Sequence, residues 1–395
     1  MTRTDHWLLP EGIEELLPDE ARRLERLRRA LLDLYAAWGY ELIVPPMVEY
    51  LESLLTGAGR DLDLQTFKLI DQLSGRLLGL RADMTPQAAR IDAHALKREH
   101  PVRLCYLGTV LRTRPEGLGG TRSPMQVGAE LYGHAGLESD LEIIALMLET
   151  LAMTGVSDVH LDLGHVGVFR HLARAARLDA EQEAELFDML QRKALPELEQ
   201  RLDGMAIDVA CREAFLALPE LHGGAEVIDR ARSLFSALPA PVVEAVEALA
   251  AMVERVRAQW PSLPVNVDLA ELRGYAYQTG LVFAAFVPGT GHEVARGGRY
   301  DEIGRIFGRA RPATGFSADL RELMQLGRQA MEPRECILAP PMGTDAGLEQ
   351  AVSRLRSQGR CVLRELPGQA GDARAMGCTA RLVERDGEWV LAPVE

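Results

Sequence analysis

Residues 106–133, YLGTVLRTRPEGLGGTRSPMQVGAELYG, constrain the fold most, because they predict two antiparallel strands joined by a long loop. Apolar residues run through 104–111, Pro115 and the glycine-rich residues 117–120 interrupt the pattern, and MQVGAELYG resumes it. A long hairpin of this kind belongs in a sheet, and we expect it to carry polar groups inward.

The polar residues of this hairpin predict a ligand site. Gln126, Gly128 and Glu130 share one face of the second strand because they are two apart, and Arg112 lies near the end of the first. Gly128 is expected to leave room for a ligand. The set suits a zwitterion, with Arg112 for a carboxylate and Glu130 or Gln126 for donors. The alternative is a salt bridge on a sheet surface.

Length and composition indicate an ordinary globular protein. At 395 residues with 47% hydrophobic and 26% charged residues, the chain is expected to form two or three domains. The N-terminus lacks the pattern of a signal peptide, and no run of about 18 apolar residues occurs. We therefore expect a cytoplasmic protein with no membrane partner.

Cysteine spacing and net charge exclude several classes of site. The five cysteines are scattered and never form C-x-x-C, which favours reduced thiols over a disulfide framework or a metal site. His165 and His171 lack metal-ligand spacing as well, and we predict neither a metal nor a cofactor. A net charge of -14 disfavours broad nucleic-acid binding, so no nucleic-acid partner is expected.

The N-terminal region predicts a helix followed by a short strand. Asp19 is expected to cap a helix that runs to about Trp38 and ends at Gly39. YELIV then reads as a strand that Pro45 and Pro46 stop. The run GYELIVPPMVEY resembles motif 1 of class II aminoacyl-tRNA synthetases, specifically the histidyl enzymes. The resemblance implies a homodimer, because motif 1 forms the dimer interface in that family.

Residues 66–90, TFKLIDQLSGRLLGLRADMTPQAAR, predict a hairpin followed by a helix that opens with Pro86. Asp83 and Thr85 stand just before this helix, and by themselves they are best interpreted as its caps. In histidyl-tRNA synthetases the similar L-R-P-E-G-T places an acidic residue and a threonine on the amino group of histidine. The resemblance therefore implies that Asp83 and Thr85 bind that group.

The long hairpin resembles motif 2 of the same family. The resemblance places Arg112 on the residue that contacts carboxylate and phosphate, and Gln126 and Glu130 on residues that hold histidine, with Glu130 facing the imidazole. Arg114 stands where the family has a glutamate that helps to place adenine. This departure puts ATP binding in doubt.

The segment RGYAYQTG resembles the family's histidine-specific loop, so Arg273 and Tyr277 are implied in histidine binding, while Gln278 replaces a second tyrosine. The block EVARGGRYDEIGRIFGRARPATGFSADLRELMQL resembles a Gly-Gly-Arg-Tyr-Asp turn followed by motif 3. The resemblance places Tyr300 near the imidazole. Glu322 stands where the family has the arginine that anchors triphosphate, unless the register slips by one and Arg321 takes that place.

The expected fold is α+β, a class II aminoacyl-tRNA synthetase-like antiparallel sheet flanked by helices. Residues 1–330 form the histidyl-synthetase-like core, with a helical insertion at about 166–259. The insertion contains no motif, and its charged residues are expected to lie on solvated helix faces. Residues 331–395 form a short C-terminal α/β domain, roughly half of the anticodon-binding domain that a synthetase would have.

Motifs that keep the histidine contacts and lose the ATP contacts look like the family of ATP phosphoribosyltransferase regulatory subunits. That resemblance implies a non-catalytic subunit for the first step of L-histidine biosynthesis, with L-histidine as effector. Its partner would be a short-form catalytic subunit, and the chain would form a homodimer within a hetero-oligomer. The alternatives are a divergent histidyl-tRNA synthetase, a free-standing histidine-activating ligase, and an α+β scaffold without a ligand. Stoichiometry and the site of histidine action stay open.

Overall fold

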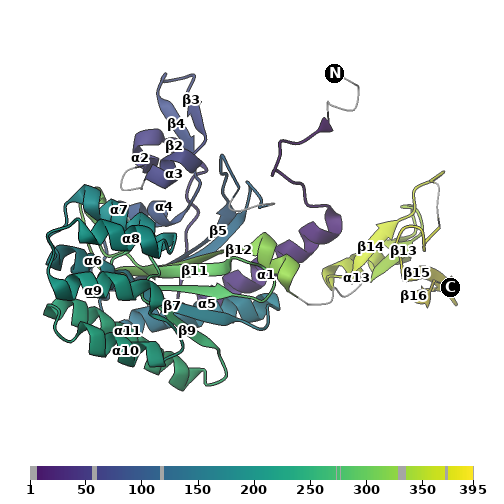
Figure 1. Ribbon diagram of the computed structural model, residues 1–395. Helices are drawn as coiled ribbons and strands as arrows, with labels where there is room; N and C mark the ends of the chain where they lie inside the picture. The colour runs from purple at the N-terminus through teal and green to yellow at the C-terminus, as the bar shows by residue number, and fades with distance from the viewer. Residues whose placement is uncertain are drawn as a thin grey trace. The chain divides into compact units, whose positions relative to one another are not determined.

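The computed structural model describes residues 7–55, 60–115, 120–272, 274–275, 277–327, 335–369 and 372–394. The chain divides into two compact units, Met1–Gln329 and Ala330–Glu395, which are shown in Figure 1. Each unit has its own sheet and its own apolar core.

A nine-stranded sheet forms the centre of the first unit, in the order β1-β5-β6-β12-β11-β10-β7-β9-β8. Its strands, in that order, are Glu41–Leu42, Val102–Thr109, Met125–Tyr132, Ala313–Asp319, Glu293–Arg299, Leu281–Phe286, His160–His165, Val265–Asp268 and His222–Gly223. The pairs β1/β5 and β7/β9 are parallel, and the strands between them pair antiparallel. The predicted hairpin is therefore confirmed as β5 and β6, and the antiparallel sheet as the centre of the fold.

The alternation along β6 separates a core face from a site face. Val127, Ala129 and Leu131 pack into the main apolar cluster. Because side chains alternate along a strand, Gln126 and Glu130 lie on the opposite face. Helix α5 (Leu137–Thr154) covers the core face and supplies buried residues such as Ile143 and Met147.

Helix α1 (Pro18–Ala37) packs on α5 and on α12 (Leu320–Leu326). Its apolar stripe, Leu24, Leu27, Leu31, Leu34 and Tyr35, is buried. Tyr35 Oη lies 3.1 Å from Thr150 Oγ1. The prediction that Asp19 caps this helix is wrong. Leu17 is the N-cap residue and Asp19 lies within the first turn, where Pro18 already fixes the backbone.

The insertion consists of six helices between β7 and β9, with one departure from the predicted all-helical segment. The helices α6 to α11 are Val166–Ala175, Ala180–Gln191, Leu195–Asp203, Val209–Ala217, Glu226–Phe235 and Ala240–Gln259. Asp179 and Gln182 form a capping box that begins α7. After the 3-10 turn Leu218–Glu220, strand β8 joins the edge of the main sheet. None of the helices in the described ranges is long and apolar enough to cross a membrane.

A small three-stranded sheet, in the order β2-β4-β3, carries the segment that leads to Asp83. Its strands are Val48–Tyr50, Leu77–Leu80 and Lys68–Ile70. The predicted turn is confirmed, with Gly75 in the left-handed region at φ 71°. Around this sheet lie α2 (Leu51–Leu55), α3 (Arg60–Gln65), α4 (Thr85–Arg90) and the π-helix Ile91–Leu96.

The predicted Gly-Gly-Arg-Tyr-Asp turn begins later than expected. Gly297, Gly298 and Arg299 continue strand β11, and the chain turns at Tyr300 and Asp301 before the 3-10 helix Ile303–Phe307. Gly297 and Gly298 are required here because an added Cβ would overlap the neighbouring strands.

The second unit has a four-stranded sheet in the order β14-β13-β15-β16. Its elements in chain order are β13 Cys336–Ala339, α13 Ala346–Ser357, β14 Cys361–Arg364, β15 Ala380–Arg385 and β16 Glu388–Pro393. The unit is therefore α/β, as the sequence predicts. Leu348 and Val352 of α13 pack on Ile337 and Val362 of the sheet.

Truncation of Leu31 tests the packing of α1. Its side chain is fully buried among α1, α5 and the sheet, so Leu31→Ala should lower the free energy of unfolding by about 2–5 kcal/mol. Urea unfolding followed by circular dichroism measures this change. Leu73→Ala is the matched control, because Leu73 is 98% exposed and its truncation should change stability by less than about 0.5 kcal/mol. Equal effects of both substitutions would contradict the packing described.

Candidate functional site

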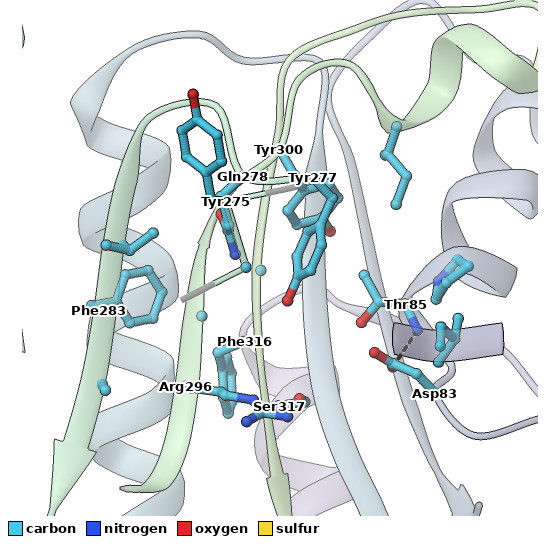
Figure 2. Close-up of a pocket in the computed structure, with 18 of the residues that line it drawn as sticks. Asp83, Thr85, Tyr275, Tyr277, Gln278, Phe283, Arg296, Tyr300, Phe316 and Ser317 are labelled. Atoms are coloured by element: carbon cyan, nitrogen blue, oxygen red, sulfur yellow. Dashed lines mark hydrogen bonds between the residues drawn. The ribbon is translucent and has the colours of Figure 1, made fainter. Parts of the chain in front are cut away.

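A cavity of about 470 Å³ opens on the site face of the large sheet and is shown in Figure 2. Its size lies within the range of about 300–1,000 Å³ that is usual for small-molecule sites. Its polar side chains come from the sheet, from α3, from the start of α4 and the residues before it, from the insertion and from the loop before β10. They are Gln65, Asp83, Thr85, Glu130, Gln191, Glu271, Tyr275, Tyr277, Gln278, Arg296, Tyr300 and Ser317.

Glu130 is the buried acid of this cavity. Its Oε1 accepts a hydrogen bond of 2.8 Å from the Tyr106 hydroxyl, and its Oε2 accepts one from the Tyr300 hydroxyl. Thr85 Oγ1 lies 3.0 Å from the same Tyr106 hydroxyl. Gly315 is the cross-strand partner of Glu130, and any Cβ there would overlap the carboxylate. The sequence therefore makes room for this carboxyl group at the cost of a side chain on β12.

Burial raises the pKa of Glu130 to about 8. The hydrogen bonds from Tyr300, Tyr106 and Thr85 act in the opposite direction, and the nearby Asp83 charge adds to the rise. The pocket therefore holds a carboxyl group that is largely protonated at neutral pH.

Gln126 positions Asp83. Its Oε1 accepts from the backbone N–H of Met84 at 2.9 Å, and its Nε2 donates to Asp83 Oδ1 at 2.7 Å. Asp83 Oδ1 also accepts from the backbone N–H of Thr85 at 2.9 Å. Asp83 therefore accepts a local backbone hydrogen bond and also lines the cavity. The alternative that Thr85 caps the helix is wrong, because Met84 is the N-cap residue of α4 and the Thr85 hydroxyl contacts Tyr106. Gln126 is not among the described residues that line the cavity.

The expectation that Gly128 leaves room for a ligand is wrong, because the Tyr106 hydroxyl fills that space, 2.6 Å from where a Cβ would lie. Arg112 lies three residues beyond β5, and its Nε is 3.4 Å from the Ala82 carbonyl oxygen. It is likewise absent from the described lining of the cavity. The sequence predicts a site from Arg112, Gln126, Gly128 and Glu130. Of these four, only Glu130 is among the described residues that line the cavity.

The loop before β10 contributes Tyr277 and Gln278, which both line the cavity. Tyr277 is 42% exposed, while Gln278 is buried and its Oε1 has no hydrogen-bond partner in the described structure. An unsatisfied buried acceptor is costly, so it suits a ligand N–H donor. Arg273, which the resemblance implies in histidine binding, lies outside the described residues.

Sequence reasoning missed several lining residues. Phe187 and Gln191 come from α7 of the insertion, where no motif is expected, and the ring of Phe187 lies 5.2 Å from that of Tyr275. Arg296 and Ser317 lie on adjacent strands of the sheet. Strand alternation could have predicted the position of Arg296. It stands two residues before Gly298, which pairs with Gly315 on the site face, so the two residues point to the same side of the sheet.

Carboxylates occupy the site face beyond Arg296, where the resemblance places nucleotide contacts. Asp319 Oδ1 accepts from the backbone N–H groups of Met125 and Arg321 at 3.0 Å each. Glu322 Oε1 lies 2.6 Å from His292 Nε2. Burial raises the pKa values of both Asp319 and Glu322. The Arg321 side chain points elsewhere and contacts Ser123 and Glu14, so it does not supply the cation of the shifted register.

Comparison with known proteins identifies what the chain resembles. Residues 12–323 match the family described as histidyl-tRNA synthetase, and residues 334–392 match the ATP phosphoribosyltransferase subunit HisZ C-terminal domain. A protein of Thioalkalivibrio sulfidiphilus named ATP phosphoribosyltransferase regulatory subunit is 59% identical over 393 residues, 99% of each chain.

Two solved structures agree with these matches. An ATP phosphoribosyltransferase regulatory subunit/histidyl-tRNA synthetase from Bacillus halodurans has 28% identity and a TM-score of 0.82, over 94% of this chain and 95% of that one. Histidyl-tRNA synthetase from Nostoc shares the fold at 21% identity and a TM-score of 0.77, over 98% and 97%. The expected class II synthetase-like fold is thereby confirmed.

Titration of Glu130 should make stability depend on pH. Because its pKa lies near 8 in the folded protein against an ordinary 4.5, the folded chain holds more protons than the unfolded chain between these values. The free energy of unfolding then falls as pH rises through this window, by up to about 1.4 kcal/mol per pH unit. Glu130→Gln lacks this titration and is the reference.

Urea unfolding of both proteins from about pH 5 to about pH 8 measures the effect. The stability of the wild type relative to Glu130→Gln should fall steadily with pH, since all other groups titrate alike in the two proteins. A difference that stays constant over this range would mean that Glu130 is ionised throughout.

Proposed function

The chain belongs to the family of ATP phosphoribosyltransferase regulatory subunits, built on a histidyl-tRNA synthetase-like domain, and from this we propose that it senses L-histidine for a separate catalytic subunit. The reaction would be the first step of histidine biosynthesis, and the chain would act in the cytoplasm, where its five cysteines stay thiols. The names of its relatives support a regulatory role without catalysis of its own.

The observation that carries the proposal is the buried Glu130 among the hydroxyls of Tyr106 and Tyr300. A ligand whose side chain is a polar ring with N–H groups can hydrogen-bond to this buried carboxyl group. An apolar side chain could not, and it would leave the carboxyl group facing a group with no hydrogen-bonding atoms. The unsatisfied Oε1 of Gln278 offers a further acceptor for an imidazole N–H. Asp83 and Thr85 on the wall suit the α-ammonium group.

The proton count also favours histidine. A neutral imidazole beside a protonated Glu130 and an imidazolium beside the Glu130 carboxylate contain the same total number of protons. The two states differ only in which group holds the shared proton. Because the ordinary imidazole pKa is about 6.5 and that of Glu130 is about 8, histidine binds between these values without exchanging a proton with water at this pair. This window includes the physiological range.

A homodimer is supported by the edge of the main sheet. Strand β1 ends the strand order; Leu42 within it is 49% exposed, and Val44 just after it is 83% exposed. An open strand edge with exposed apolar residues is a site for pairing with a second copy. We propose that this edge, next to α1, forms a two-fold interface within a hetero-oligomer.

Assembly with a short-form ATP phosphoribosyltransferase tests the regulatory proposal. Co-expression of the two chains should give a stable complex that is more active than the catalytic chain alone and is inhibited by histidine. Since a ligand shifts an equilibrium only through its differential affinity, histidine must bind the inhibited complex more tightly. Glu130→Ala should raise the half-inhibitory histidine concentration more than tenfold, because truncating one partner of a buried charged contact costs about 2–5 kcal/mol.

Glu142→Ala is the matched control, because this half-buried glutamate pairs with Arg103 and lies outside the cavity lining. A Glu130→Ala complex that assembles and is inhibited at an unchanged midpoint would place the effector site elsewhere. A chain that does not assemble with the catalytic subunit would overturn the regulatory proposal itself.

The absence of amino-acid activation is a separate expectation. Activation needs cations that stabilise charge on the phosphates, and Asp319 and Glu322 instead place carboxylates at that end of the site face. The purified chain should show no histidine-dependent pyrophosphate exchange above background, with an authentic histidyl-tRNA synthetase as positive control. Exchange above background would restore the enzyme alternative.

A further inference from the structure

Strand β11 carries a cation into the cavity. Arg296 pairs across the sheet with Ala284 of β10 and Ser317 of β12, and all three residues line the cavity. Figure 2 shows Arg296 and Ser317 side by side at its floor. A guanidinium and a hydroxyl therefore lie together on the site face, with Ser317 on β12 next to β6 and Arg296 on β11, one strand further.

The other charged groups of the lining are acids. Asp83, Glu130 and Glu271 are carboxylic acids, and Arg296 is the one cationic side chain among the lining residues that the structure describes. Asp83 lies across the cavity from Arg296 in Figure 2, beside Thr85. An acid and a cation on opposite walls match the two ends of a zwitterion.

We propose that Arg296 recognises the carboxylate of the amino-acid ligand, with the Ser317 hydroxyl as a second donor. The inference rests on the proposed histidine-binding function and assigns one residue within it. The ammonium group of the ligand then faces Asp83 and Thr85, and its side chain extends to Glu130 and Tyr300. A guanidinium suits this role because its planar fork matches a carboxylate.

Arg112, to which the family resemblance gives the carboxylate contact, is placed differently. Its Nε is 3.4 Å from the Ala82 carbonyl oxygen. Burial raises the pKa of Asp319, and the charge of Arg112 offsets part of that rise. It therefore lies toward the acidic end of the site face. Carboxylate recognition in this chain has moved from the motif 2 arginine to a residue of β11.

The ion pair between Arg296 Nη1 and Glu293 Oε1, 3.0 Å long, is compatible with this role. A guanidinium has five N–H donors in a plane, so it can contact two carboxylates at once. The pocket then favours ligands with a free, charged carboxylate. Histidinamide lacks that charge, so the same residue distinguishes free histidine from its amide.

Calorimetry with L-histidine and L-histidinamide tests the assignment in a double-mutant cycle. The wild-type protein should bind histidine at least about tenfold more tightly than histidinamide. In Arg296→Gln histidine affinity should fall by at least about tenfold, while histidinamide affinity changes less than about twofold. Arg296→Lys keeps the charge without the fork and should retain part of the preference.

Glu293→Gln separates ligand recognition from a structural role. If Arg296 serves only its ion pair with Glu293, the two glutamine variants should weaken histidine binding equally. The proposal expects Glu293→Gln to bind histidine at least as tightly as the wild type, because a competing carboxylate has been removed. Thermal unfolding confirms that each variant is folded before binding is compared.

Two results would overturn the proposal in different ways. If Arg296→Gln keeps the preference for histidine over histidinamide and Arg112→Gln removes it, the carboxylate site lies at Arg112 and the histidine pocket stands. If the wild-type protein binds neither ligand at millimolar concentration, the proposed function itself fails, and the assignment of Arg296 fails with it.

Discussion

The buried carboxyl group of Glu130 is the constraint on which the site depends. A carboxylic acid in the middle of a sheet is tolerated only if its oxygens are hydrogen-bonded, and the hydroxyls of Tyr106 and Tyr300 meet that need. These tyrosines in turn fix their neighbours, because Gly128 must yield space to one hydroxyl and Gly315 to the carboxyl group. A single buried acid therefore determines residues on four strands or their ends.

The regular part of the fold was predictable because its signals are local. Alternation along residues 104–111 and 125–133 is enough to place β5 and β6, and the stripe from Leu24 to Tyr35 is enough to place α1. The exact start of α1 was not predictable from a capping residue, because the helix has no side-chain cap. Leu17 is its N-cap residue, Pro18 occupies the first helical position and Asp19 lies in the first turn. Local patterns also gave Gln126 and Glu130 a common face.

The division of labour within the site was not predictable from the same patterns. Gln126 and Asp83 are 43 positions apart, and only the folded chain brings the amide of one to the carboxylate of the other. Phe187 and Gln191 enter from an insertion that reads as solvated helices. A family resemblance directs attention to matching motif positions, so it passes over Arg296, which directly precedes the Gly-Gly-Arg-Tyr-Asp motif.

In the proposed function, the placement of the walls would let this pocket serve regulation without catalysis. Its lining comes from the sheet, from Leu62 and Gln65 of α3, and from Phe187 and Gln191 of α7. A ligand that touches all three stabilises one arrangement of them over others, and it does so by the difference in its contacts. Catalysis requires a site that binds the transition state, whereas sensing requires one that joins separate elements. In the proposed function, Asp319 and Glu322 disfavour a nucleotide while Arg296 binds the amino acid, and this combination favours the second requirement over the first.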